Sequence, residues 1–137
     1  MSLHLVKLCV GVGEISELAD WQKRRRREKK RVYHVTRMMP RRTAELLDGG
    51  SLYWVIRGLI LVRQRIIAIE PFVDDDEIDR CKLVFDPLLV PVEPRPRRPF
   101  QGWRYLDGGE APADIPGGLG DGLPAKLRAE LAALGLL

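Results

Sequence analysis

The strongest β signal in the chain is residues 51–69, which read SLYWVIRGLILVRQRIIAI. Two runs rich in aliphatic, β-branched and aromatic residues meet at Arg57-Gly58, and this pattern predicts a β-hairpin. In the second run the even positions are apolar apart from Gln64, whereas the odd positions include Arg63 and Arg65. Because side chains alternate between the two faces of a strand, we expect the even face to pack on the core and both arginines to point away from it.

The sequence on either side of this hairpin predicts further strands and two helices. Strands are expected at residues 3–10, 32–37, 80–86, 88–92 and 102–106, helices at 14–30 and 40–48, and an extended proline-rich segment at 91–99. Composition rich in β-formers indicates the strands, and apolar residues near helical spacing indicate the helices. We therefore expect an α+β fold, a small, mixed, strongly bent sheet or a β-barrel with two or three peripheral helices.

A chain of 137 residues is the size of one domain and is long enough to bury a core without disulfides. We expect a single α+β domain at residues 1–106. Residues 107–122 are dense in glycine, proline and aspartate, which is typical of a linker. Residues 123–137 are expected to form a C-terminal helix that packs on the domain through Leu123, Leu127, Leu131 and Leu134.

Composition and motifs indicate a cytoplasmic protein without a metal or a cofactor. The N-terminal segment contains Lys7 and reads as a strand rather than a signal peptide, and no run is long enough to span a bilayer. The two cysteines, Cys9 and Cys81, read as reduced, small apolar residues. His4 and His34 have no partner at metal-ligand spacing. The oligomeric state stays open.

The net charge of +4 includes a dense basic run at residues 23–31, which holds eight basic residues and one acidic residue, Glu28. Like charges four residues apart repel on a helix, so we expect this helix end to fray unless anions neutralise it. We interpret the run as a phosphate-binding surface with Arg24, Arg25 and Arg27 as contacts. A solvated helix end and an anionic membrane surface are the alternatives.

A second set of basic and aromatic residues also suggests a nucleic-acid partner. Arginines and aromatic residues alternate over residues 95–105, where phosphates and a stacked base could be bound together. On the hairpin, a turn centred on Arg57-Gly58 places Trp54 on the outward face beside Arg63. In the alternative reading the aromatic rings fill the core, and the arginines are solvated or paired with the acidic residues 74–76. The candidate contacts are Arg37, Trp54, Arg57, Arg63, Arg65, Arg97, Arg98, Trp103 and Arg104.

No enzyme motif is complete. Gly11-Val12-Gly13 lies between a predicted strand and a predicted helix, but Ser16 stands where a dinucleotide fingerprint has its third glycine. We therefore predict a non-catalytic domain that binds nucleic acid, RNA in preference to DNA, with neither a metal nor a membrane as partner. One alternative is a protein-interaction module that docks through the terminal helix. The other is a small enzyme for a nucleotide-like or acyl substrate, whose pocket would contain His34, Arg37, Tyr53 and Arg65.

Four stretches of the chain are specific enough to resemble a known family. They are LHLVKLCV (3–10), RTAELLDGGSLYWVIRG (42–58), RQRI (63–66) and PRRPFQGWRYL (96–106). They resemble a family of small bacterial proteins of unknown function, which implies no activity. The short helix followed by Gly50 and a strand ending at Arg57 is also similar to the opening of ASCH domains. That resemblance implies a PUA-like β-barrel, a fold that typically binds RNA, although Leu52 stands where those domains carry a lysine.

Overall fold

The computed structural model describes residues 2–115, which form two helices and seven strands. In chain order they are β1 (Leu3–Leu8), α1 (Ile15–Lys29), β2 (Val32–Thr36), α2 (Thr43–Leu47), β3 (Ser51–Ile56), β4 (Leu59–Val73), β5 (Asp79–Phe85), β6 (Val90–Pro96) and β7 (Trp103–Asp107). The strands form one sheet in the order β2-β5-β4-β3-β1-β7, and β6 also pairs with β4. The β1–β3 pair is parallel and the other described pairs are antiparallel, so the expected α+β class is confirmed.

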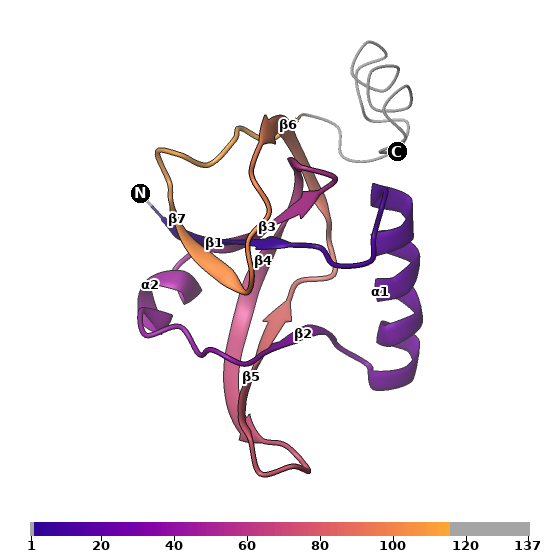
Figure 1. The fold of residues 1–137 in the computed structure, drawn as a ribbon, viewed down its shortest axis with the longest axis vertical. Coiled ribbons are helices and arrows are strands. Elements are labelled where there is room, and N and C mark those ends of the chain that lie inside the picture. Colours follow the sequence, from indigo (N-terminus) through magenta and orange to yellow (C-terminus); the bar gives the residue numbers. More distant parts are fainter. Residues whose placement is uncertain (1, 116–137) are drawn as a thin grey trace.

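The long strand β4 connects the two parts of the sheet (Figure 1). Its first half pairs with β3 on one edge and with β6 on the other, and its second half pairs with β5. The amide of Asp86 donates to the carbonyl of Arg65 at 2.9 Å, so β5 and β6 follow one another along the same edge. Irregular pairing between Ile60 and Val62 and near Ile66 bends the strand. The sheet therefore curves around an apolar interior.

The predicted β3–β4 hairpin is present, with its turn at Arg57 and Gly58. Both residues have positive φ, 50° and 80°, which corresponds to a type I′ turn. A bulge between Trp54 and Val55 shifts the pairing, so that Trp54 lies opposite Val62. The expectation that Trp54 lies on the outward face is therefore wrong, because the bulge turns the indole into the core, where it is 2% exposed.

The two end strands of the sheet, β2 and β7, do not pair within residues 2–115, and side chains of β7 instead contact the loop that follows β2. Trp103 Nε1 donates to the carbonyl of Met38 at 2.7 Å. The phenol oxygen of Tyr105 accepts a hydrogen bond from the amide of Arg41 at 3.0 Å. The closed barrel that the sequence offered as one form of the fold is therefore absent from the described part of the chain, because its end strands do not pair.

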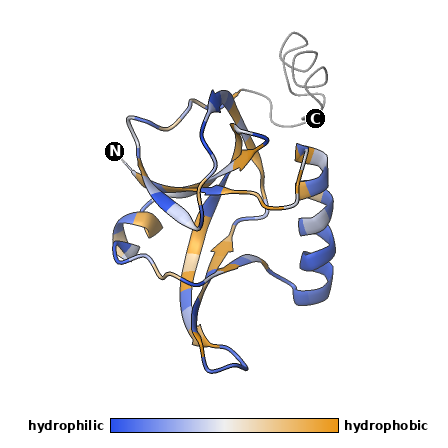
Figure 2. Ribbon diagram, in the orientation of Figure 1, coloured by the Kyte–Doolittle hydropathy of each residue, from blue (hydrophilic) through white to orange (hydrophobic). Residues whose placement is uncertain are grey.

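Apolar residues pack on both faces of the sheet. The larger cluster joins Leu18 of α1 and Leu46 of α2 to Trp54 and Phe85 of the sheet. The smaller cluster contains Val6 and lies on the other face of β1 and β3. Figure 2 shows apolar residues concentrated in the strands, whereas α1 is mostly hydrophilic. Neither helix in the described range has the length and apolarity needed to cross a membrane.

The segment that directly follows β7, up to Ile115, packs on the domain, whereas the sequence predicted a linker there. Ile115 is buried, and its amide donates to the carbonyl of Pro91 at 2.9 Å. Asp114 forms a β-bridge with Val92. Pairing with β6 therefore holds this segment on the domain despite its low apolar content. The rest of the expected linker (116–122) and the expected C-terminal helix (123–137), which the docking alternative requires, lie outside the described residues.

Candidate functional site

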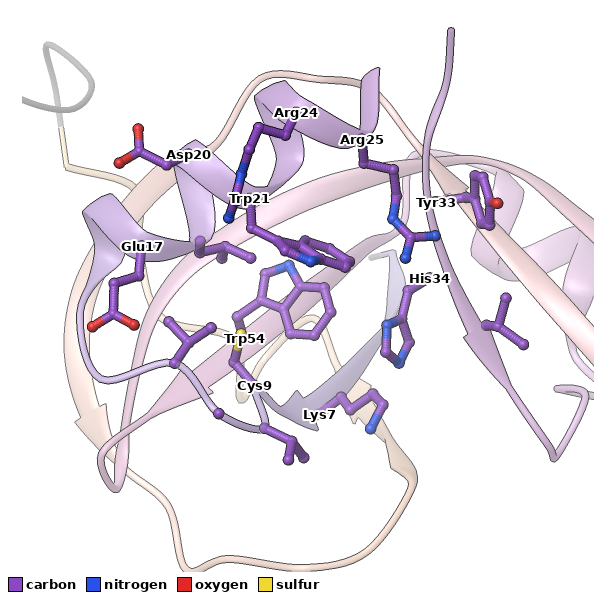
Figure 3. A pocket seen from close by; sticks show the side chains of 15 residues that line it. Lys7, Cys9, Glu17, Asp20, Trp21, Arg24, Arg25, Tyr33, His34 and Trp54 are labelled. Atoms are coloured by element: carbon purple, nitrogen blue, oxygen red, sulfur yellow. The ribbon is translucent and has the colours of Figure 1, made fainter. Parts of the chain in front are cut away.

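A pocket of about 660 Å³ lies between α1 and the strands β1, β2 and β3 (Figure 3). This volume is in the range of small-molecule sites, and the lining mixes apolar walls with a few polar groups, as such sites do. The pocket collects residues from four separate elements, so it exists only in the folded chain. Its basic and aromatic lining consists of Lys7 of β1, Trp21, Arg24 and Arg25 of α1, Tyr33 and His34 of β2, and Trp54 of β3.

Helix α1 carries an arginine across the aromatic part of this pocket. The guanidinium carbon of Arg25 lies 4.6 Å from the ring centre of Trp21 and 5.0 Å from that of Tyr33. Figure 3 shows the guanidinium between the two rings, above His34. Such cation–π contacts are worth about 0.5–1 kcal/mol at partly exposed positions. The free protein therefore holds a planar cation against two half-buried aromatic faces.

The basic end of α1 is regular rather than frayed. The helix continues to Lys29, and Lys30 adopts a left-handed conformation whose amide donates to the carbonyl of Arg26 at 2.8 Å. Basic side chains in the last turn interact favourably with the negative end of the helix dipole. Arg31 also forms an ion pair with Glu70 at 2.7 Å. These contacts oppose the like-charge repulsion that led us to expect fraying.

A buried amide network holds the indole of Trp54, which lines the pocket. The side chains of Gln22 and Gln64 donate to each other at 2.7 and 2.8 Å, and Trp54 Nε1 donates to Oε1 of Gln64 at 3.0 Å. Nε2 of Gln64 also donates to the carbonyl of Asp86 at 3.3 Å. An indole N–H can only donate, so the oxygen of Gln64 must face Trp54. The network ties α1 to β4 and sets the orientation of the indole.

His34 enters the pocket as a neutral ring. Its imidazole packs edge-on against Trp54, with 5.5 Å between ring centres. Burial, together with the positive charges of Lys7 and Arg25, lowers the pKa of His34 to about 4. Among residues 2–115 no hydrogen-bond partner is found for either ring nitrogen. His34 therefore offers one donor and one acceptor to a ligand at neutral pH.

The thiol of Cys9 also lines the pocket. Burial raises the pKa of this thiol to about 12, against the opposing effect of Lys7. A protonated thiol is a weak nucleophile and a poor metal ligand. No group of three or more His, Cys, Asp or Glu side chains suited to a metal ion occurs in the part of the chain that the structure describes. The side chains that line the pocket present positive charges, aromatic rings and hydrogen-bonding groups to a ligand.

The pocket contains three of the residues predicted as nucleic-acid contacts, Arg24, Arg25 and Trp54. The structure places Trp103, Trp54 and Arg63 differently from an open outward surface. Trp103 is buried and bonded to Met38, so its ring packs in the core. Trp54 does not lie on the outward face of the hairpin, and its buried indole lines the pocket. Arg63 is not an open cation, because Nε and Nη2 both bind Asp114 at 2.7 Å.

The remaining predicted contacts are spread over the surface. Arg27, Arg37, Arg65 and Arg98 are exposed and lie outside the pocket lining, and Arg57 is exposed at the hairpin turn. Arg97 and Arg104 cover the ring of Phe100 at 5.3 and 5.2 Å. Phe100 packs on the smaller apolar cluster, so this basic–aromatic group is separated from the pocket by the sheet. These predicted contacts therefore do not share one surface with the pocket.

Sequence reasoning did not assign the pocket residues Lys7, Trp21 and Tyr33 to a site, and it named His34 only for the enzyme alternative. Lys7 lies in register with Trp54 in the parallel β1–β3 pair, so both side chains project from the same face. Pairing between strands that lie this far apart in the chain cannot be predicted from a local sequence pattern. A usable signal was the position of Trp21, at the end of the apolar stripe of α1 and one turn before Arg25.

Fold and site together define an α+β protein with a basic and aromatic pocket beneath one helix. The chain belongs to the family described as "Protein of unknown function (DUF1489)", whose model matches residues 5–137. The resemblance to a family of unknown function is thus confirmed. Comparison with curated proteins and with solved structures gives no match.

Proposed function

We propose that this protein binds nucleic acid, RNA in preference to DNA, and that it catalyses no reaction. One observation supports the proposal: the pocket brings the cations Lys7, Arg24 and Arg25 together with the aromatic rings of Trp21 and Tyr33. Cations beside stacking rings are the usual means of holding single-stranded nucleic acid. Proteins that recognise RNA mostly take unpaired bases out of loops and ends, and a pocket suits such a base.

The energies favour a base in this pocket over a purely electrostatic contact. Stacking of one base on an aromatic side chain contributes about 1–3 kcal/mol. That reaches or exceeds the roughly 1–2 kcal/mol by which two partly exposed cation–π contacts, with Trp21 and Tyr33, hold Arg25 in place. The exposed basic side chains of α1, including Arg24 and Arg27, then lie where the flanking phosphates would run.

A small enzyme for a nucleotide-like substrate is the second candidate, and the presence of His34 in the pocket favours it. Two observations weigh against it. The pKa of His34, near 4, makes the ring a weak base at neutral pH, and the Cys9 thiol stays protonated. The other residues expected for an enzyme pocket, Arg37, Tyr53 and Arg65, do not line this one. We therefore assign the pocket to binding.

We also propose that the bent sheet is related to PUA-like barrels, opened between β2 and β7. The order α2, Gly50, β3 and Arg57 supports this relation. Gly50 lies so close to the carbonyls of Leu46 and Leu3 that a Cβ atom would clash with both, so the tight helix-to-strand junction requires glycine. The free thiols of Cys9 and Cys81 support a cytoplasmic location, because disulfides mark oxidising compartments.

The proposal is tested by titrating the protein with fluorescent single-stranded RNA and DNA of the same sequence. We expect tighter binding to RNA. The variant Arg24→Gln/Arg25→Gln should weaken binding and lower the slope of log K against log salt by about 1.4, because each phosphate contact on a single strand contributes about 0.7.

The matched control is Arg65→Gln/Arg98→Gln, which removes the same charge from exposed positions outside the pocket. We expect this control to change the affinity and the salt slope much less. Absence of binding at low salt contradicts the proposal, and equal losses in both double variants contradict the assignment to the pocket.

A further inference from the structure

The face of α1 that lines the pocket changes in character along the helix axis. Glu17 lies near its N-terminal end, Trp21 follows one turn later, and Arg24 and Arg25 follow after another turn. Figure 3 shows Glu17 at one end of the pocket and Arg25 with His34 at the other, with Trp21 between them. Seven residues separate Glu17 from Arg24, which is about 10.5 Å along a helix. A ligand that extends along the pocket from Glu17 to Arg24 must carry hydrogen-bond donors at one end and negative charge at the other.

A nucleoside monophosphate has this arrangement, with a flat base between a hydrogen-bonding edge and an anionic phosphate. The ring of Trp21 is the natural place for the base, and in the free protein that ring is covered by the planar guanidinium of Arg25. For the Trp21 ring, stacking with a base is a stronger contact than one cation–π contact, and the guanidinium can keep its contact with Tyr33. The base would therefore displace the guanidinium, which remains near enough to bind the phosphate together with Arg24.

The acidic end of the pocket selects among the bases. An ionised carboxylate only accepts hydrogen bonds, and it accepts two at once from adjacent donors. Guanine is the common base with two adjacent donors, N1–H and the N2 amino group, on its pairing edge. Adenine and uracil each place an acceptor beside their donor there, and that acceptor repels a carboxylate. Enzymes and binding proteins read extruded bases through this edge.

We infer that the pocket beneath α1 takes one unpaired guanine nucleotide, with the base on Trp21, its pairing edge at Glu17 and its phosphate at Arg24 and Arg25. This inference rests on the proposed function and specifies the ligand of the same site. It turns a general RNA-binding surface into one with a preferred base.

The experiment uses the full chain and RNA heptamers of uridine in which the central nucleotide is guanosine, inosine, adenosine or uridine. Tryptophan fluorescence and anisotropy report binding. We expect the guanine heptamer to bind at least tenfold more tightly than the adenine and uridine heptamers. Inosine keeps N1–H but lacks the N2 amino group, so its affinity should fall between those of guanine and adenine.

Two carboxylate variants assign the preference. Glu17→Gln should remove most of the discrimination between guanine and adenine while binding to the uridine heptamer is retained. Glu93→Gln is the matched control, since Glu93 is an exposed carboxylate outside the pocket lining and its loss should leave the discrimination intact. Both positions are exposed, so neither substitution is expected to unfold the protein.

The outcomes separate this inference from the proposed function. Equal affinity for all four heptamers overturns the guanine assignment and leaves RNA binding standing. A guanine preference that survives Glu17→Gln also overturns the assigned role of Glu17. If none of the heptamers binds at low salt, the proposed function fails together with the inference.

Discussion

Replacement of Gln64 by leucine tests how much the buried amide network behind Trp54 stabilises the fold. Gln64 is fully buried at 0% exposure, and leucine has a similar size. The substitution leaves two buried polar groups without a partner, Trp54 Nε1 and the side-chain amide of Gln22, and also removes the bond to the part-buried carbonyl of Asp86. A buried polar group left unsatisfied costs about 1–3 kcal/mol. We therefore expect Gln64→Leu to lower the free energy of unfolding by about 3 kcal/mol or more.

The double variant Gln22→Leu/Gln64→Leu separates the lost hydrogen bonds from the lost packing. It removes both amides, so the orphaned group at position 22 disappears with its partner. The two substitutions should therefore be non-additive, with a coupling of about 1–2 kcal/mol that makes the double variant more stable than the sum of the single changes predicts.

Urea unfolding followed by circular dichroism measures these differences. Gln101→Leu is the control, because Gln101 is exposed and forms no part of the network. Its effect should stay within about 0.5 kcal/mol of the parent. If Gln64→Leu is as mild as this control, or if the cycle is additive, the reasoning about the network is refuted.

Three further predictions concern stability. The unfolded chain protonates His34 near its ordinary pKa of 6.5, and the folded chain only near 4. As the pH is lowered from 6.5 to 4, the free energy of unfolding should therefore decrease by up to about 3 kcal/mol. His34→Gln should flatten this pH dependence in urea titrations at a series of pH values. Gly50→Ala should cost about 3 kcal/mol or more, because the new methyl meets the carbonyl of Leu46, and a thermal melt close to that of the parent would contradict it. Arg63→Gln removes the bidentate pair with Asp114, so limited proteolysis should cut residues 107–115 faster, with a stability loss of only about 1 kcal/mol because the pair is partly exposed.

Much of the secondary structure follows from the sequence because its determinants are local. The hairpin at residues 51–69, the helix expected at 14–30 and the α+β class depend on alternation, helical spacing and turn residues a few positions apart. The turn at Arg57-Gly58 is present even though arginine rarely occupies a position of positive φ. The basic run was also visible in the sequence, and two of its arginines line the pocket.

The tertiary structure decided which of these side chains are available to a ligand. One bulge beside Trp54 moved the indole from the expected outer face into the core, since a one-residue shift in pairing reverses the face. Asp114 lies 51 positions from Arg63, yet it neutralises that arginine. The pocket itself joins Lys7, Trp21 and His34 through strand pairings and helix packing that no local pattern records. These contacts follow from the pairing of strands that are distant in the sequence. That pairing depends on how separate segments bury their apolar faces together, so no single segment determines it.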